Sequence, residues 1–417
     1  MKAVSPDNIV NVVGSTICYG DCTFDCSLRT ADLVGRDGEI IVDGDLTAGR
    51  LIKIRRGELY VHRNLSAEKL EVDRRVEVSG DLDSDKVDVG GALIVGGKTR
   101  ATRLDVGGSV HAEDDAEVEH IDVGGSVHVE GATKSDTIDV GGKFTGKGTV
   151  EAEKIDVGGS VKIDSEATVG EVDVGGTVRV AGGAILRKIE VGGSFGSSRP
   201  LKFRSIEVGG SVNIAGGEGG NIDVGGSFKS DGDLTFNHID VGGKVEILGD
   251  ASGTSIDVGG KVAVRNNLTL SGKLNVGGKV EIGENIKAEA ISVGGRLQAE
   301  RADAEEEIKT NTLITNAGAK AQRIEIGRRG EAQGPIIAGI VLIRERARVE
   351  DIYAESLTLR RGSRARNIYA ARVEIESDCR ISGEVKYTES LRAESDVRFA
   401  SAPKKVEKLP APPFLQL

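Results

Sequence analysis

A Val-Gly-Gly motif recurs along the sequence at a nearly constant spacing. Successive copies begin about 17 residues apart, and only two of the spacings depart from this period, each by a single position. A fixed period of this length is typical of a solenoid, in which each repeat packs only on its neighbours. The thirteen copies begin at Val89, Val106, Val123, Val140, Val157, Val174, Val191, Val208, Val224, Val241, Val258, Val276 and Val293.

The apolar residues within each repeat indicate the shape of one turn. They come in three pairs, and a single polar residue separates the members of a pair, which is the alternation of a half-buried strand and not the spacing of a helix. In one copy the pairs are Ile155 and Val157, Val161 and Ile163, and Ala167 and Val169. The pattern predicts an all-β fold: a single-stranded triangular β-helix (β-solenoid) with about 17 residues per turn. We expect the Gly-Gly pair to form a corner that needs a positive φ and has no room for side chains.

Composition agrees with a long, narrow core. The 417 residues include 59 Gly and no Trp, and aromatic residues are only 3%. Several conventional globular cores would need more aromatic volume, while 38% hydrophobic residues exclude disorder. Roughly 23 turns over residues 10–400 would make a rod near 110 Å long.

The chain divides by pattern into five segments. Residues 1–30 are an N-terminal segment with the first turns, 31–88 are divergent turns, and 89–300 are the Val-Gly-Gly block. Residues 301–400 have slightly shorter turns of about 16 residues. Residues 401–417 hold four of the seven prolines, so we expect a flexible tail that cannot continue the solenoid.

Two regions resemble the bactofilin family of polymer-forming cytoskeletal proteins. They are D-G-D-L-T-A-G-R-L-I-K-I-R-R-G at residues 43–57 and three runs between 323 and 370: R-I-E-I-G-R-R-G-E-A-Q-G, V-L-I-R-E-R-A-R-V-E-D-I-Y-A and L-T-L-R-R-G-S-R-A-R-N-I-Y-A. The resemblance implies a right-handed β-helix and filaments that assemble without nucleotide. The usual bactofilin domain is several-fold shorter, so the Val-Gly-Gly block looks like an expansion inside it.

The last turns are the predicted polymer interface. Leu391, Val397 and Phe399 point into a final turn that no later turn covers, and uncovered strand edges favour association. The resemblance implies a polymer contact for a Phe near this position, which we assign to Phe399. The alternative is that the tail folds over this end and Phe399 belongs to the core. The expected partner is therefore another copy of the chain.

A column of carboxylates is the second candidate surface. Its residues lie between the first two apolar residues of each repeat and face outward. They could bind cations or a basic partner. We favour instead a solvated column without a ligand, in which neighbours such as Lys86, Arg103 and Lys154 reduce the repulsion between the carboxylates. The acidic ladder consists of Asp88, Asp105, Asp122, Asp139, Asp156, Asp173, Asp223, Asp240 and Asp257, with Glu190 and Glu207 in the same series.

Charge is unevenly distributed along the chain. Residues 301–417 carry 21 Lys and Arg against 18 Asp and Glu, a net of +3, whereas the rest carries 34 against 48, a net of −14. The Arg-rich third could bind an acidic membrane surface or a protein partner, or be an ordinary solvated face. The total of −11 gives no reason to expect nucleic-acid binding. No apolar run or signal peptide is present, so we expect a cytoplasmic protein, with membrane association as an open alternative.

Motifs for metal binding and catalysis are weak. Cys18, Cys22 and Cys26 have no usual zinc spacing and are expected to be core thiols, and His111 and His128 lie on adjacent turns. The run A-L-I-V-G-G-K-T has Ala92 where a phosphate-binding loop needs Gly. We therefore expect no catalytic residue, metal, nucleotide or other cofactor.

The sequence favours a structural cytoskeletal protein whose rods associate end to end into nucleotide-independent filaments. A monomeric rod-like scaffold that binds partners through its Arg-rich end and Pro-rich tail is the alternative. A left-handed β-helix acyltransferase is disfavoured, because its hexapeptide period, protruding loop and catalytic His are not found.

Overall fold

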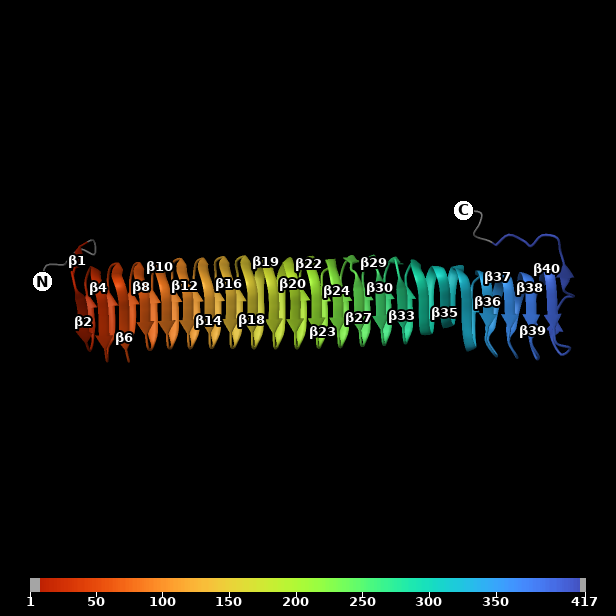
Figure 1. Ribbon diagram of the computed structural model, residues 1–417, viewed down its shortest axis with the longest axis horizontal. Helices are drawn as coiled ribbons and strands as arrows, with labels where there is room; N and C mark the ends of the chain where they lie inside the picture. Colours follow the sequence, from red (N-terminus) through yellow and green to blue (C-terminus); the bar gives the residue numbers. More distant parts are fainter. Residues whose placement is uncertain (1–7, 413–417) are drawn as a thin grey trace. The chain divides into compact units, whose positions relative to one another are not determined.

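The structure is a computed structural model that describes residues 8–412. These residues form β-strands and no helix (Figure 1). Contacts divide the chain into unit 1, Met1–Gly210, and unit 2, Ser211–Leu417. Each unit is a β-solenoid of parallel strands, and the two together contain about 23 turns of about 17 residues. The predicted fold class is confirmed.

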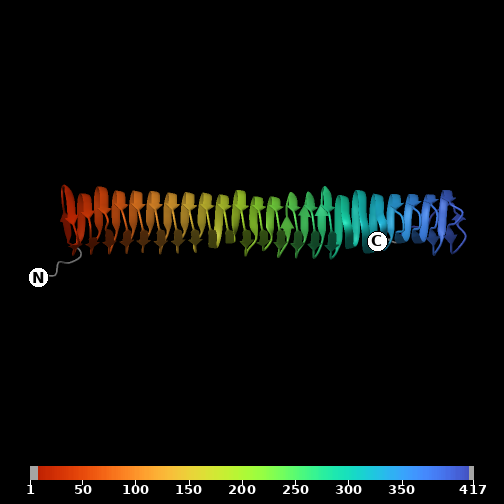
Figure 2. The same ribbon diagram turned by 90° about the horizontal axis from the view of Figure 1, so that it is seen from below.

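Unit 1 contains turns whose strands pair in register with the turns before and after. Val89, for example, pairs with Val106, the equivalent residue of the next turn, and Figure 2 shows this stacking from a second side. Its strands are β1 (Ile9–Asn11), β2 (Ser15–Tyr19), β3 (Cys22–Phe24), β4 (Ser27–Arg36), β5 (Glu39–Val42), β6 (Leu46–Arg55), β7 (Glu58–Val61), β8 (Leu65–Val72), β9 (Arg75–Val78), β10 (Leu82–Val89), β11 (Ala92–Val95), β12 (Thr99–Val106), β13 (Ser109–Ala112), β14 (Ala116–Val123), β15 (Ser126–Val129), β16 (Thr133–Val140), β17 (Lys143–Gly146), β18 (Val150–Val157), β19 (Ser160–Val174), β20 (Thr177–Val191), β21 (Ser194–Ser197) and β22 (Leu201–Val208).

Unit 2 is built the same way, and some of its later turns are shorter. Val341 pairs with Leu357 and Leu357 with Val373, so two successive turns have the predicted 16 residues. The turn before them has 17 residues and the turn after them has 18, so the shorter period holds for only part of residues 301–400. Its strands are β23 (Ser211–Ile214), β24 (Gly217–Val224), β25 (Ser227–Ser230), β26 (Leu234–Thr235), β27 (His238–Val241), β28 (Lys244–Ile247), β29 (Ala251–Gly253), β30 (Ser255–Val258), β31 (Lys261–Val264), β32 (Leu268–Leu270), β33 (Lys273–Val276), β34 (Lys279–Ile282), β35 (Asn285–Gln333), β36 (Ile336–Ile343), β37 (Arg348–Leu359), β38 (Arg364–Ile375), β39 (Arg380–Ile381), β40 (Val385–Ala393), β41 (Arg398–Phe399) and β42 (Lys404–Lys405).

The core consists of the predicted apolar pairs. Ile155 and Val157, for example, are at most 1% exposed. Phe144, Phe195 and Phe228 are among the largest fully buried side chains. They replace Val at one inward position, since Phe144 pairs with Val127 on one side and Val161 on the other. A narrow core of stacked aliphatic side chains therefore continues from turn to turn.

Of the two causes predicted for the Gly-Gly corners, the lack of room for side chains is confirmed and the positive φ is wrong. No glycine of a Val-Gly-Gly motif within residues 8–412 has a positive φ. Close packing explains them instead, because a Cβ on Gly108 would lie 2.3 Å from the carbonyl oxygen of Gly91. Positive φ occurs at other corners, such as Arg346 (60°) and Gly362 (73°) in the shorter turns of unit 2.

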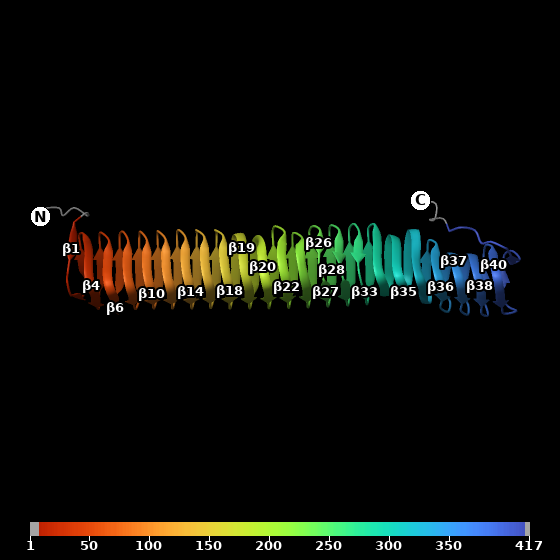
Figure 3. The ribbon, with the colours of Figure 1, turned by 45° about the horizontal axis from the view of Figure 1, so that its top comes forward.

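The tail also differs from its prediction. Lys404–Lys405 forms β42, which pairs in parallel with Lys386–Tyr387 of β40, so this part of the tail does continue the solenoid. Figure 3 shows the chain after β42 turning back along unit 2 towards β37. The terminal run Phe414–Leu417 lies outside the described residues.

Candidate functional site

The N-terminal turn of unit 1 has an apolar surface that the sequence analysis missed. Within residues 8–412, seven large hydrophobic side chains are exposed, and five belong to this turn. Val10 pairs with Leu28 and so extends the core column, yet it is 44% exposed because no described turn precedes it. The five residues, which we call the N-terminal apolar surface, are Ile9, Val10, Val13, Ile17 and Tyr19.

Local alternation explains why Ile17 and Tyr19 are exposed. In β2 the side chain of Cys18 is buried, so its two neighbours on the strand face outward and are 60% and 77% exposed. The described strand pairings of β1 and β2 run only to β4, so each of these strands has a free edge. Such an edge with exposed apolar side chains is a site for pairing with another chain.

The predicted polymer interface lies on the last turn of unit 2. Phe399 pairs with Ile381, and Leu391 pairs with Val373, so both continue buried core columns. Leu391, Val397 and Phe399 are half-buried, which places them on a turn that is only partly covered. The strand β42 lies on β40 and not on β41, so the edge that carries Phe399 is not paired with a strand of the tail as far as the tail is described, up to residue 412.

Tail residues 408–412 border an open groove on the side of unit 2. The opposite wall is formed by Ile337, Tyr353 and Tyr369, and the groove has a volume of about 430 Å³. The two tyrosine rings lie 4.9 Å apart between centroids. Tyr369 is only 8% exposed, and it lines this groove together with the tail residues.

The predicted acidic ladder is a real column in each unit. In unit 1, Asp88, Asp105 and Asp122 pair in register, and the column continues through Asp139, Asp156 and Asp173 to Glu190 and Glu207. In unit 2, Asp223, Asp240 and Asp257 form the corresponding column.

Neighbouring Lys and Arg side chains offset the repulsion between carboxylates in only part of the unit 1 column. Lys154 lies 3.0 Å from Asp156, Arg103 lies 3.8 Å from Asp122, and Lys188 contacts Glu190 and Glu207 at 2.7 and 2.9 Å. Among residues 8–412, Asp139 has no ion pair of its own. Burial, and then the charges of Asp156 and Asp122, raise the pKa of the Asp139 carboxyl. Ionisation of Asp139 is therefore less favourable in the folded chain than in the unfolded chain.

Asp139→Asn should stabilise unit 1 at neutral pH. Because the folded-state pKa of Asp139 is raised, its ionisation costs stability as pH rises through that pKa, by at most about 1 kcal/mol at this solvent-screened site. The gain should disappear at acid pH, where Asp139 is protonated in both states. Thermal unfolding at several pH values measures it. Asp164→Asn, which removes an ion pair with Lys162 at 2.8 Å, is the control and should give no gain; equal gains for both variants would contradict the assignment.

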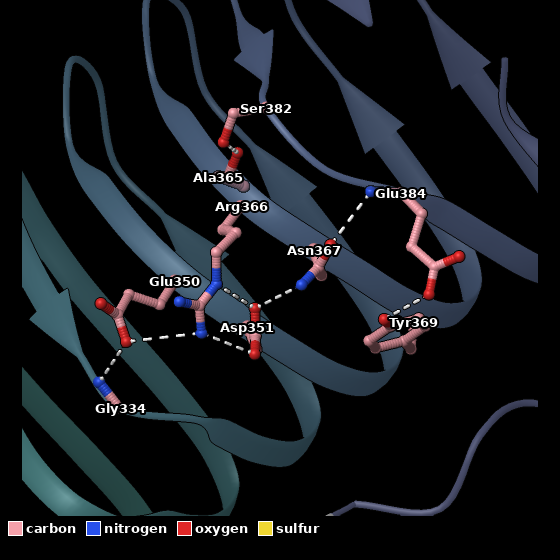
Figure 4. A network of polar contacts seen from close by, with 9 residues as sticks. All are labelled: Gly334, Glu350, Asp351, Ala365, Arg366, Asn367, Tyr369, Ser382 and Glu384. Carbon is pink, nitrogen blue, oxygen red and sulfur yellow. Dashed lines mark hydrogen bonds and ion pairs between the residues drawn. The ribbon is translucent and has the colours of Figure 1, made fainter. Parts of the chain in front are cut away.

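Many arginines of the Arg-rich third are paired within unit 2. Arg366 donates two hydrogen bonds of 2.8 Å to Asp351 and lies 3.7 Å from Glu350 (Figure 4). These hydrogen bonds hold the pKa of the Asp351 carboxyl below its usual range. In the same network the Tyr369 hydroxyl donates to Glu384 at 2.6 Å. These contacts tie successive turns together and leave less free positive charge than the count of arginines suggests.

Some of the cysteines and histidines lie in pairs. Cys18, Cys26 and Cys379 are buried and Cys22 is half-buried, and all four thiols are free. Burial and the neighbouring Cys22 raise the pKa of the Cys18 thiol to about 12. The rings of His111 and His128 stack with centroids 5.1 Å apart. Within residues 8–412, no three His, Cys, Asp or Glu side chains are grouped closely enough to hold a metal ion.

Comparison of the chain with family models, curated proteins and solved structures found no match. Among the described residues, no helix has the length and apolar character needed to cross a membrane.

Proposed function

We propose that the chain is a structural protein whose solenoid rods associate end to end into filaments without nucleotide. The N-terminal apolar surface is the observation that carries this proposal. Five large apolar side chains are exposed to water on one turn, next to free strand edges, and association with the end of another copy would bury them. The proposal includes no catalytic role and a cytoplasmic location, in keeping with the resemblance of residues 43–57 and 323–370 to bactofilins.

The C-terminal turn supports the same assembly. Phe399 continues a column that is fully buried at Ile381, one turn earlier. A second copy stacked on this turn would complete the burial of Phe399 and pair the free edge of β41. In this arrangement β42 would remain on the neighbouring strand β40.

A monomeric rod that acts as a scaffold is the second candidate. The observation that favours it is the tail, because β42 pairs with part of the C-terminal edge and residues 408–412 form one wall of the groove beside Tyr353. If the tail is sufficient to block this end, copies would not stack. The two candidates differ in whether the last turn takes part in association.

Phe399→Arg should abolish end-to-end association and leave folding intact. The side chain is half-buried on a terminal strand, so a charge is tolerated in the monomer but would be desolvated between two copies. Sedimentation velocity measures the loss, and circular dichroism checks the fold. Phe399→Leu is the control and should still associate. If Phe399→Arg sediments like the unaltered protein, Phe399 is not a polymer contact.

A further inference from the structure

Four arginines of unit 2 form a column on successive turns. Arg348 pairs with Arg364, Arg364 with Arg380, and Arg380 with Arg398. All four side chains are exposed, and adjacent positions in such a column are about 4.8 Å apart. Across residues 8–412 none of the four has an ion pair or a side-chain hydrogen bond. We call this column the arginine ladder.

The arginine ladder differs from the other arginines around it. Arg344 contacts Glu325 at 2.9 Å, Arg366 contacts Asp351 at 2.8 Å, and Arg372 contacts Glu389 at 3.0 Å. Like charges placed directly opposite on neighbouring strands repel one another. The ladder therefore concentrates positive charge that the chain itself does not neutralise, and an anionic partner with matching spacing would relieve the repulsion.

The same unit carries a column of the opposite charge. Asp223, Asp240 and Asp257 pair in register on successive turns and are exposed. Within the described part of the chain these three carboxylates have no ion pair. We call this column the carboxylate ladder. Because each ladder places one charge on every turn, both have the same spacing of about 4.8 Å.

We propose that the arginine ladder of one copy binds the carboxylate ladder of a second copy, so that copies associate side by side. A guanidinium on each turn meets a carboxylate on each turn, and one register aligns several pairs at once. The contact is heterologous, because different residues form its two sides. Each copy can therefore bind one neighbour through each ladder and extend the association. This lateral contact is separate from the end-to-end contact proposed above.

Surface plasmon resonance with one full-length copy immobilised and a second in solution tests the proposal. Binding should be strong at about 0.01 M salt and weaker at about 0.15 M, where the Debye length falls from about 30 to about 8 Å. The triple variant Arg348→Glu, Arg364→Glu and Arg380→Glu should weaken low-salt binding at least about tenfold, because three ion pairs become repulsive. The end-to-end contact relies on apolar burial, so its binding signal should not depend on salt and should persist in this variant. Loss of the salt-sensitive signal therefore reports on the lateral contact, and loss of the salt-insensitive signal reports on the end-to-end contact.

The matched control is the triple variant Arg328→Glu, Arg361→Glu and Arg392→Glu. It changes the net charge equally at exposed arginines outside the ladder and should leave low-salt binding unchanged. A second triple variant, Asp223→Lys, Asp240→Lys and Asp257→Lys, should also lose binding. The two ladder-reversed variants should bind each other when one is immobilised and the other is in solution. The unaltered arginine ladder of one can face the unaltered carboxylate ladder of the other, and the two reversed ladders are also complementary.

Three results would overturn the proposal. The first is equal loss of binding in the ladder and control variants, which would show a net-charge effect. The second is a failure of the two reversed variants to bind each other. The third is a result in which the unaltered protein shows no salt-sensitive binding between copies but does show salt-sensitive binding to phosphatidylserine vesicles or to duplex DNA. It would assign the arginine ladder to a lipid or nucleic-acid partner.

Discussion

The double variant Val10→Asp and Val13→Asp should lose end-to-end association while its solenoid remains folded. Val10 is 44% and Val13 is 102% exposed on the first described turn, so the monomer gains two solvated carboxylates there. In an assembled pair the same side chains would be buried against a second copy. Losing the burial of two valines should weaken association at least about hundredfold, and desolvation of the new charges adds to the loss.

Sedimentation equilibrium over a range of protein concentrations measures this change. The matched control is Leu186→Asp with Ile340→Asp, because these residues are 60% and 49% exposed but lie far from either terminal turn in sequence. The control adds the same charge and removes similar apolar area, and it should associate like the unaltered protein. If both double variants lose association, the added charge is the cause and not the position of the substitutions. If neither variant loses association, the N-terminal apolar surface is not part of the end-to-end contact.

Gly125→Val should destabilise unit 1 by about 3 kcal/mol or more, which is the range of severe steric substitutions. A Cβ on Gly125 would lie 2.3 Å from the carbonyl oxygen of Gly108, and this oxygen also accepts the backbone hydrogen bond of Ser126 at 3.2 Å. Relief of the clash must separate two turns. Since each turn is stabilised only by its neighbours, the damage should divide the cooperative unit at this position.

Thermal unfolding and limited proteolysis test the effect of Gly125→Val. We expect a lower first transition and a new cleavage site near residue 125, with the remaining turns protected. Ser126→Val is the control, because its side chain is exposed and a β-branched residue suits a strand. If Gly125→Val unfolds like the unaltered protein, close packing is not the reason for the Gly-Gly corners.

The repeating part of the fold was predictable, because spacing alone determines it. Alternation placed Ile155 and Val157 inside, where they are buried, and it placed the carboxylates between them in one outward column. The cause of the Gly-Gly corners was predicted only in part. A Gly-Gly pair can be required either by crowding or by a positive φ, and the sequence does not distinguish these two causes. The structure does, because it shows that Gly108 lies against Gly91 of the preceding turn.

The ends of the chain were less predictable than its repeats. Ile17 and Tyr19 have the alternation of a core pair, but Cys18 between them is the buried residue. Their exposure depends on which side of β2 faces the core, and composition does not determine that. The proline content of the tail likewise indicated a flexible extension, whereas Lys404–Lys405 pairs with the edge of β40.

The arginine ladder could have been found from the sequence by aligning the shorter turns of the last third. Arg348, Arg364 and Arg380 recur at the period of these turns, so they occupy equivalent positions. Their lack of partners could not be found in this way, because Arg344 and Arg366 are close in sequence and are paired. Only the side-chain geometry separates free arginines from paired ones.

Electron microscopy of the purified full-length protein, in buffer without nucleotide, tests whether the rods associate end to end. We expect filaments whose axial repeat is near 110 Å, the length of roughly 23 stacked turns. Added ATP or GTP should not change their number or length. Discrete rods of a single length at every protein concentration, with no end-to-end contacts, would contradict the proposed filament assembly. That result would favour the monomeric scaffold instead.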